Sequence, residues 1–111
     1  MALADLLIAL RDQVPLTEAQ IARGTGADEG TVREWVERRR VPAGEPSQHL
    51  AELIAFVQEM AINVSAKALA EWWLAGQVDF LSGANPLDEI AAGRYERMID
   101  YARGLTNGVF T

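Results

Sequence analysis

The fold of this chain is decided by residues 17–35, which read TEAQIARGTGADEGTVREW. Thr17 and Gln20 have the spacing of a capping box, which begins a helix, and the two glycines that follow keep this helix short. Asp28 is a favourable N-cap residue for a second helix. The stretch therefore predicts two short helices that are joined by a tight turn.

Four positions in this stretch fit a helix-turn-helix: Ala22, Gly26, Val32 and Trp35. Ala22 is small, as required where the following helix crosses over it, and Gly26 allows a left-handed backbone at the turn without strain. Val32 and Trp35 would bury the inner face of the second helix. We therefore expect an N-terminal helix-turn-helix unit.

The flanking sequence predicts further helices on both sides of this unit. Leucines at helical spacing indicate an amphipathic helix over residues 2–13, which Pro15 ends. Pro42 and Gly44 are expected to stop the second of the two short helices. Ser47 then begins a longer helix in which apolar residues recur with the helical period.

Ser65 is the next N-cap residue, and the helix behind it carries Trp72 and Trp73. Because neighbouring side chains point about 100° apart on a helix, the two rings cannot share one direction. One ring is expected in the core, and the other is a candidate for a groove or an interface. The sequence does not distinguish which is which.

Two more helices are predicted near the end of the chain. Asn85 is followed by Pro86, which is the combination of an N-cap residue and a proline at the first helical position. The short helix that they begin is expected to end at Gly93. A last helix over residues 95–105 ends at the Asn107-Gly108 pair.

These patterns together predict an all-α fold, because no alternating apolar pattern is long enough for a strand. We expect two parts, with their boundary in residues 42–47. Residues 1–45 would form the helix-turn-helix domain. Residues 46–111 would form a helical linker and a small C-terminal helical domain.

The composition suits a folded domain without a strongly basic surface. Half of the 111 residues are hydrophobic and the net charge is −6. Residues 1–45 contain six arginines against eight acidic residues, a net charge of −2, and residues 46–111 contain four basic residues against eight acidic ones, a net charge of −4. This balance argues against a strong nonspecific nucleic-acid binder.

The sequence also favours a cytoplasmic protein. It contains no cysteine, which fits a reducing compartment. No apolar run approaches the roughly 20 residues that span a membrane, and the apolar N-terminal stretch lacks the features of a signal peptide. We therefore expect a soluble protein that does not bind a membrane.

Residues for catalysis are sparse. His49 is the only histidine and is expected at the surface, near the start of a helix. No phosphate-binding glycine loop, nucleophile elbow or metal-ligand spacing is present in the sequence. We expect no enzymatic activity, no cofactor and no metal.

The predicted helix-turn-helix offers few groups for DNA. Asp28 and Glu29 stand at the start of its second helix, where base contacts are made, and their carboxylates would repel phosphates. The three consecutive arginines could contact phosphates or could complement the negative C-terminal end of the helix dipole. The candidate DNA contacts are Gln20, Thr31, Arg33, Arg38, Arg39 and Arg40.

The segment Gly108-Val109-Phe110-Thr111 is unusually apolar for a chain end. Phe110 therefore needs a pocket, for which there are two interpretations. The ring could fold back beside Trp72 or Trp73 and cap the core, as most apolar residues at domain ends do. Alternatively, it could enter a cavity in another protein.

A family resemblance favours the second interpretation. The residues that carry it are, in order, Trp73-Leu74, Gly83, Pro86-Leu87-Asp88, Ile90 and Gly108-Val109-Phe110. This order resembles the toxin-binding domain of the Xre-type antitoxins, which are paired with RES-domain toxins. In that family a helix-turn-helix domain precedes a small helical toxin-binding domain, so the resemblance covers nearly the whole chain.

The resemblance implies a function. RES-domain toxins consume NAD, and their antitoxins dock the second domain and place the C-terminal segment at the entrance of the active site. Carried over, Gly108, Val109, Phe110 and Thr111 would block the toxin, with Tyr101 and Leu105 on the flanking helix. It also implies a homo-oligomer or a higher-order complex with the toxin, and in many members repression of the operon.

One alternative function stays open at the level of the sequence. The chain could be a plain helix-turn-helix transcriptional regulator, whose C-terminal half serves as a dimerisation domain. This alternative predicts tight, salt-dependent binding of operator DNA.

Overall fold

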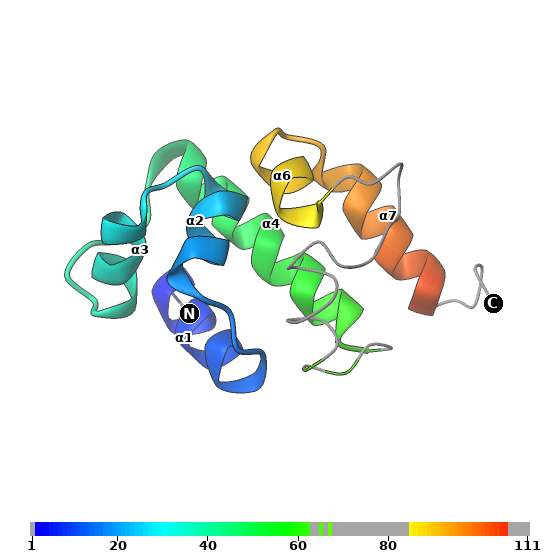
Figure 1. Ribbon diagram of the computed structural model, residues 1–111, viewed down its shortest axis with the longest axis horizontal. Helices are drawn as coiled ribbons and strands as arrows, with labels where there is room; N and C mark the ends of the chain where they lie inside the picture. The colour runs from blue at the N-terminus through cyan, green and yellow to red at the C-terminus, as the bar shows by residue number, and fades with distance from the viewer. Residues whose placement is uncertain (1, 63–64, 66, 68–84, 107–111) are drawn as a thin grey trace.

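The computed structural model describes residues 2–62, 65, 67 and 85–106. These residues form helices and no strand, so the prediction of an all-α fold is confirmed for this part of the chain (Figure 1). No helix among them is long and apolar enough to cross a bilayer. The helices are α1 (Leu3–Gln13), α2 (Glu18–Thr25), α3 (Glu29–Val36), α4 (Gly44–Met60), α6 (Pro86–Ala91) and α7 (Tyr95–Thr106).

The long helix α4 is the axis of the molecule. It packs against α1 and α2 on the side of the N-terminal helices and against α6 and α7 along the rest of its length (Figure 1). The helices α2 and α6 also contact each other directly, although they are far apart in the sequence. The N-terminal helices and the α6–α7 pair are therefore connected both through α4 and directly.

The start and the end of α2 are formed as the sequence predicts. The backbone N–H of Gln20 donates to Oγ1 of Thr17, and the N–H of Thr17 donates to Oε1 of Gln20, both at 3.0 Å. This is the predicted capping box. The helix ends at Gly26, which has a φ of 82°, a left-handed conformation that glycine adopts without strain.

The start of α3 is also as predicted, but its end is not. The backbone N–H of Thr31 donates to Oδ1 of Asp28 at 2.7 Å, which caps the helix. Val32 and Trp35 are fully buried. The helix was expected to continue towards Pro42, yet it ends at Val36.

The early end of α3 has a physical cause in the backbone at Arg38. This residue has a φ of 61°, and its N–H donates to the carbonyl oxygen of Trp35 at 3.1 Å. The N–H of Arg39 donates to the carbonyl oxygen of Glu34 at 2.8 Å. These two bonds form a Schellman motif, which ends the helix before any proline is reached.

The helix α4 begins three residues before the predicted N-cap Ser47, so that prediction is wrong. Pro46 lies in the first turn, where its missing N–H has no intrahelical partner to lose. The hydroxyl of Ser47 donates to the carbonyl oxygen of Gly44 at 2.7 Å instead of capping the helix. The helix can therefore start at Gly44.

His49 was expected at the surface and is buried, with only 7% of it exposed. It lies in the first half of α4, where a ring nitrogen, Nδ1, is 2.8 Å from Oε1 of Glu52. The prediction assumed that a polar residue near a helix start faces solvent. The hydrogen-bond partner on the next turn allows the ring to be buried.

The α6–α7 pair begins and ends close to the predicted positions. Oδ1 of Asn85 accepts a hydrogen bond from the N–H of Leu87 at 2.8 Å, and Pro86 is the first residue of α6. Gly93, with a φ of 84°, lies between the two helices. The predicted helix with Trp72 and Trp73 lies outside the described residues.

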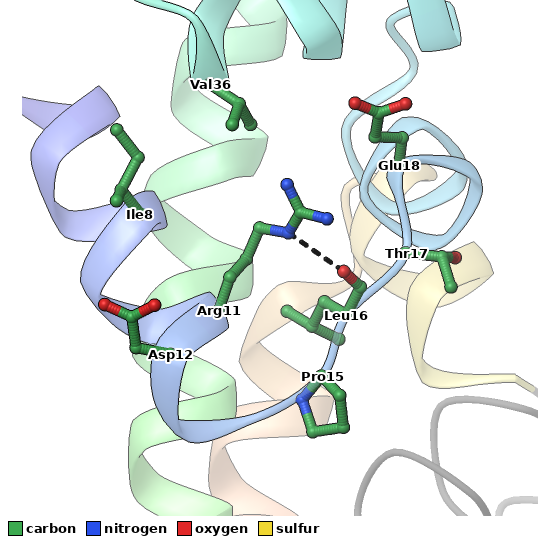
Figure 2. A pocket seen from close by; sticks show the side chains of 8 residues that line it. All are labelled: Ile8, Arg11, Asp12, Pro15, Leu16, Thr17, Glu18 and Val36. Carbon is green, nitrogen blue, oxygen red and sulfur yellow. Dashed lines mark hydrogen bonds between the residues drawn. The ribbon is translucent and has the colours of Figure 1, made fainter.

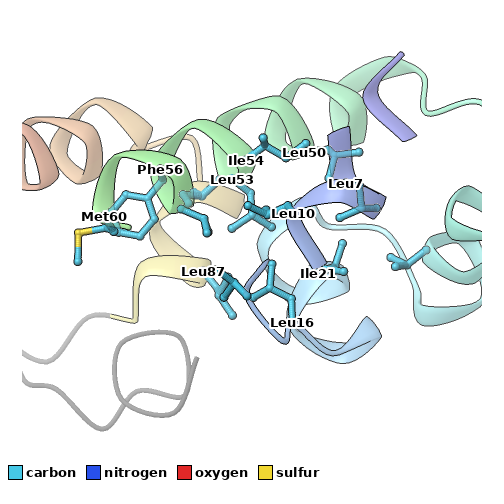
Figure 3. Close-up of a cluster of buried hydrophobic side chains, with 14 of the residues drawn as sticks. Leu7, Leu10, Leu16, Ile21, Leu50, Leu53, Ile54, Phe56, Met60 and Leu87 are labelled. Carbon is cyan, nitrogen blue, oxygen red and sulfur yellow. The ribbon is translucent and has the colours of Figure 1, made fainter. Parts of the chain in front are cut away.

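The core is continuous across the predicted boundary at residues 42–47. Figure 3 shows Leu7 and Leu10 of α1, Ile21 of α2 and Leu87 of α6 gathered on one side of α4. Met60 of α4 and Met98 of α7 are also buried.

Gly24 lets α2 approach α6 and α4 closely. A methyl group at this position would lie 3.1 Å from Cδ2 of Leu87 and 3.3 Å from Cδ2 of Leu53, which is tighter than ordinary contact. Residues 1–45 thus share a core with α6.

Candidate functional site

The residues predicted to bind a toxin fall at or beyond the end of the described chain. Tyr101 and Leu105 belong to α7, but their side chains lie outside the described part. Gly108, Val109, Phe110 and Thr111 lie outside it entirely. The structure does describe α7, the helix that precedes this segment. It packs on α4, with Met98 and Ile99 buried.

The six candidate DNA contacts lie on α2, α3 and the loop after α3. The side-chain oxygen of Gln20 accepts the capping bond from Thr17, so this group is already used. Nη2 of Arg33 lies 3.1 Å from Oε1 of Glu18, and the arginine side chain is 58% exposed. Such exposed ion pairs are weak, so the pair with Glu18 does not prevent Arg33 from changing partners.

The start of α3 is electrostatically unfavourable for DNA. Thr31 lies beside Asp28, whose pKa is lowered chiefly by the hydrogen bond from the Thr31 backbone. Asp28 therefore stays ionised at neutral pH, and exposed Glu29 follows it. The negative charge that the sequence predicted at this position is present in the structure.

Residues 37–43, between α3 and α4, form a loop that we call the arginine loop. Arg38 pairs with Asp5 of α1, Arg39 with Glu37, and Arg40 with Glu34. In all three pairs the arginine side chain is the more exposed partner, at 61% against 35%, 71% against 42% and 55% against 37%. The guanidinium groups thus form the outer layer of this surface.

The conformation of Arg38 leads to a prediction about stability. A residue with a side chain costs about 1 kcal/mol in the left-handed region, where glycine is usual, and an exposed ion pair returns at most about 1 kcal/mol. We therefore expect Arg38→Gly to leave the free energy of unfolding unchanged or to raise it by up to about 1 kcal/mol. Urea denaturation measures this change.

Arg39→Gly is the matched control, because Arg39 has no positive φ. It should destabilise the fold, since glycine gains backbone freedom on unfolding. Equal destabilisation by the two variants would show that the backbone of Arg38 is not strained.

An ion pair that the sequence did not predict joins α2 to α6. Nε and Nη2 of Arg23 donate to Oδ1 and Oδ2 of Asp88, both at 2.6 Å. The hydrogen bond from Arg23 lowers the pKa of Asp88, and the same bond raises the pKa of Arg23. No local signal could reveal this pair, because its members are 65 residues apart.

A second carboxylate on α6 joins this helix to α7. Glu89 is only 6% exposed, and Nε of Arg94 lies 2.6 Å from its Oε2. Nη1 of Arg97 lies 3.6 Å from the same oxygen. The hydrogen bond from Arg94 lowers the pKa of Glu89, so the carboxylate is ionised although it is buried.

These lowered pKa values predict a loss of stability in acid. A carboxylate whose pKa is lower in the folded state stabilises the fold above its ordinary pKa, and this stability is lost as the pH falls through the lowered value. We expect the free energy of unfolding to be level near neutral pH and to fall below about pH 4. Urea denaturation at several pH values measures it.

The variant Asp88→Asn should separate the contribution of the Arg23–Asp88 pair to this pH dependence from that of the other carboxylates. Since both side chains of the Arg23–Asp88 pair are about half exposed, the variant should lose about 1 kcal/mol at neutral pH and fall less steeply in acid. Asp100→Asn removes the same charge from an exposed position on α7 and should leave the neutral-pH stability unchanged. If the free energy of unfolding of Asp88→Asn fell as steeply in acid as that of the wild type, the Arg23–Asp88 pair would not contribute to the acid sensitivity.

A pocket of about 640 Å³ lies between α1, α3 and the start of α2 (Figure 2). Nε of Arg11 donates to the carbonyl oxygen of Leu16 at 3.0 Å, which holds the segment after α1 against the helix. Asp12 and Glu18 also line the pocket. Both signs of charge are present, and none of the six candidate DNA contacts is among the described residues that line the pocket.

In the part of the chain that the structure describes, no group of three or more histidine, cysteine, aspartate or glutamate residues could hold a metal ion. Comparison of the chain with protein-family models, curated proteins and solved structures finds no match. The class of protein must therefore be argued from the residues and their arrangement.

Proposed function

We propose that this chain is an antitoxin that neutralises an NAD-consuming RES-domain toxin. The C-terminal part would dock on the toxin, and residues Gly108 to Thr111 would block its active site. The observation that carries this proposal is the α6–α7 pair. It follows the order of parts in the family resemblance, and it leads directly into the blocking segment.

The packing of α6 supports this role. Leu87 and Ile90, two apolar positions of the resemblance, are fully buried, so they hold α6 on the core. The ion pairs of Asp88 with Arg23 and of Glu89 with Arg97 tie α6 to α2 and α7. Because α6 and α7 are already held in place, docking through them would not add the entropy cost of ordering these helices.

The chemistry of the segment suits an active-site plug. Phe110 supplies an aromatic side chain, which is the kind of residue that concentrates binding energy when it fills an apolar pocket. Gly108 separates the ring from the end of α7 and lets the backbone turn. In this proposal the chain is not an enzyme and uses no cofactor. It acts in the cytoplasm, as a homo-oligomer or in a higher-order complex with the toxin.

The direct test is inhibition of the toxin by the purified protein. A RES-domain toxin encoded next to this chain should consume NAD, and titration of the chain should stop the reaction at a fixed stoichiometry. Continued NAD consumption in the presence of excess protein would contradict the proposal.

A helix-turn-helix transcriptional regulator is the second candidate function. The observation in its favour is the pair α2 and α3, with left-handed Gly26 between them and with Val32 and Trp35 of α3 buried. Both functions can coexist in one protein, since many antitoxins of this kind repress their own operon.

The regulator predicts tight operator binding that falls steeply with salt. Arg33→Ala and Arg39→Ala should weaken that binding, because each would remove one phosphate contact. We expect weak binding with a shallow salt dependence instead, because Asp28 and Glu29 face the site of base contact. Operator titrations at several salt concentrations separate the two outcomes, and an arginine series without effect would remove the regulator.

A further inference from the structure

The arginine loop borders an apolar pocket that the proposed function does not use. This pocket, of about 300 Å³, lies where the loop meets the start of α1. Its apolar lining includes Ala2, Leu3, Val41 and Pro42, and its charged lining consists of two arginines and one carboxylate, Arg38, Arg40 and Asp5. Val41 is 79% exposed, and it and Ile62 are the exposed large hydrophobic residues of the described chain.

We propose that this pocket binds a segment of a partner protein in which an apolar side chain is flanked by carboxylates. An apolar centre with a polar rim is the usual anatomy of a protein interface, and arginine is enriched there. The apolar side chain would enter beside Val41. The flanking carboxylates would accept hydrogen bonds from Arg38 and Arg40.

The charge arrangement of the loop supports an acidic partner. In each of its three ion pairs the guanidinium is more exposed than the carboxylate, so an approaching molecule meets positive groups first. Exposed pairs of this kind contribute little to stability. The arginines can therefore exchange their internal partners for carboxylates of another chain at small cost.

The backbone of Arg38 is an independent observation. It occupies the position of the Schellman motif where glycine is preferred, with a φ of 61°. Sparsely populated backbone conformations cluster at binding and switch sites. Here the conformation holds a guanidinium at the edge of the pocket.

A nucleic acid suits this surface less well. Each of the three arginines already has one carboxylate partner, so the loop can accept only a few anionic groups, whereas DNA carries a charge about every 1.7 Å and is bound through clustered cations. Val41 and Leu3 would bury little apolar surface against a phosphate backbone. A peptide with few charges and one apolar anchor uses both features.

The test is a nuclear magnetic resonance titration of the isotope-labelled full chain with a synthetic peptide that carries a leucine between two pairs of glutamates. We expect saturable shifts of amide signals in residues 38–41 and 2–5. A peptide with glutamine in place of glutamate, and one with alanine in place of leucine, should each bind more weakly. A DNA duplex that binds this loop in preference to the peptide would overturn the proposal.

Matched variants make the test specific. Arg38→Glu with Arg40→Glu should weaken peptide binding about tenfold or more, whereas Arg103→Glu, at an exposed position on α7, should not. Val41→Ser, which touches none of the ion pairs, should also weaken it, whereas Ile62→Ser should not. Equal effects of variants and controls, or no saturable binding, would overturn the proposal.

This proposal stands apart from the antitoxin function. Phe110→Ala should keep full affinity for the peptide, because the proposed contacts are made by Val41 and the arginines of the loop. The failure of one proposal is therefore distinguishable from the failure of the other.

Discussion

Replacement of Leu87 by alanine is expected to lower the free energy of unfolding by about 3 kcal/mol. Leu87 is fully buried, and a methyl group on Gly24 of α2 would already crowd its side chain. The shorter side chain would leave a cavity where α6 meets α2 and α4, because a packed core relaxes only in part. This loss is a large fraction of the total stability of a typical domain, so we expect a large shift of the denaturation midpoint.

The number of unfolding transitions in this variant tests whether the helices share one core. Since residues 1–45 share a core with α6, a change in α6 should destabilise the N-terminal helices as well. Urea denaturation followed by tryptophan fluorescence and by far-ultraviolet circular dichroism should therefore give one coincident transition for the variant. Ile62→Ala, at a position that is 61% exposed, should change the stability by no more than about 0.5 kcal/mol. Two separate transitions would contradict a shared core.

Replacement of Phe110 by alanine is expected to abolish most of the neutralisation of the toxin. A buried aromatic anchor at the centre of an interface contributes about 2–4 kcal/mol, which corresponds to a loss of affinity of roughly 30-fold to 1,000-fold. The inhibition constant against the NAD-consuming reaction measures it.

The stability of the free protein is the control for this variant. If Phe110 is free to enter a partner, Phe110→Ala should melt at the same temperature as the wild type. If the ring instead caps its own core, the variant should lose stability, as a truncated core aromatic does. Unchanged inhibition by Phe110→Ala would defeat the plug, whatever the melting temperature.

Local sequence signals were sufficient for most helix ends. The capping pair Thr17 and Gln20, the N-cap residues Asp28 and Asn85, and left-handed Gly26 lie where the sequence predicts them. Each of these signals acts within one turn of backbone, so a single sequence contains it in full. The order of the helices and the burial of their apolar faces follow from the same periodicity.

The errors occurred where one local signal overrode another. The sequence predicts that Pro42 stops α3, but a left-handed arginine ends the helix earlier. The sequence also predicts Ser47 as an N-cap, but Pro46 is tolerated in the first turn of α4. Glycine is the usual signal for a left-handed helix end, so an arginine at position 38 does not predict the end of α3.

Long-range contacts could not be predicted from the sequence. The Arg23–Asp88 pair, the burial of Glu89 and the burial of His49 depend on which helices meet in space. Nothing in the residues around Val41 shows that they border a pocket with the start of α1. The candidate toxin-blocking segment is the reverse case, because it was found from the sequence alone and stays a prediction.

A crystal structure of this chain bound to its RES-domain toxin would show where Phe110 lies. If the antitoxin plugs the toxin with its C-terminal segment, the phenyl ring lies inside the entrance of the toxin's active site, with α7 running along the rim. A ring packed against its own helices, or one in solvent away from the toxin, would rule out the plug.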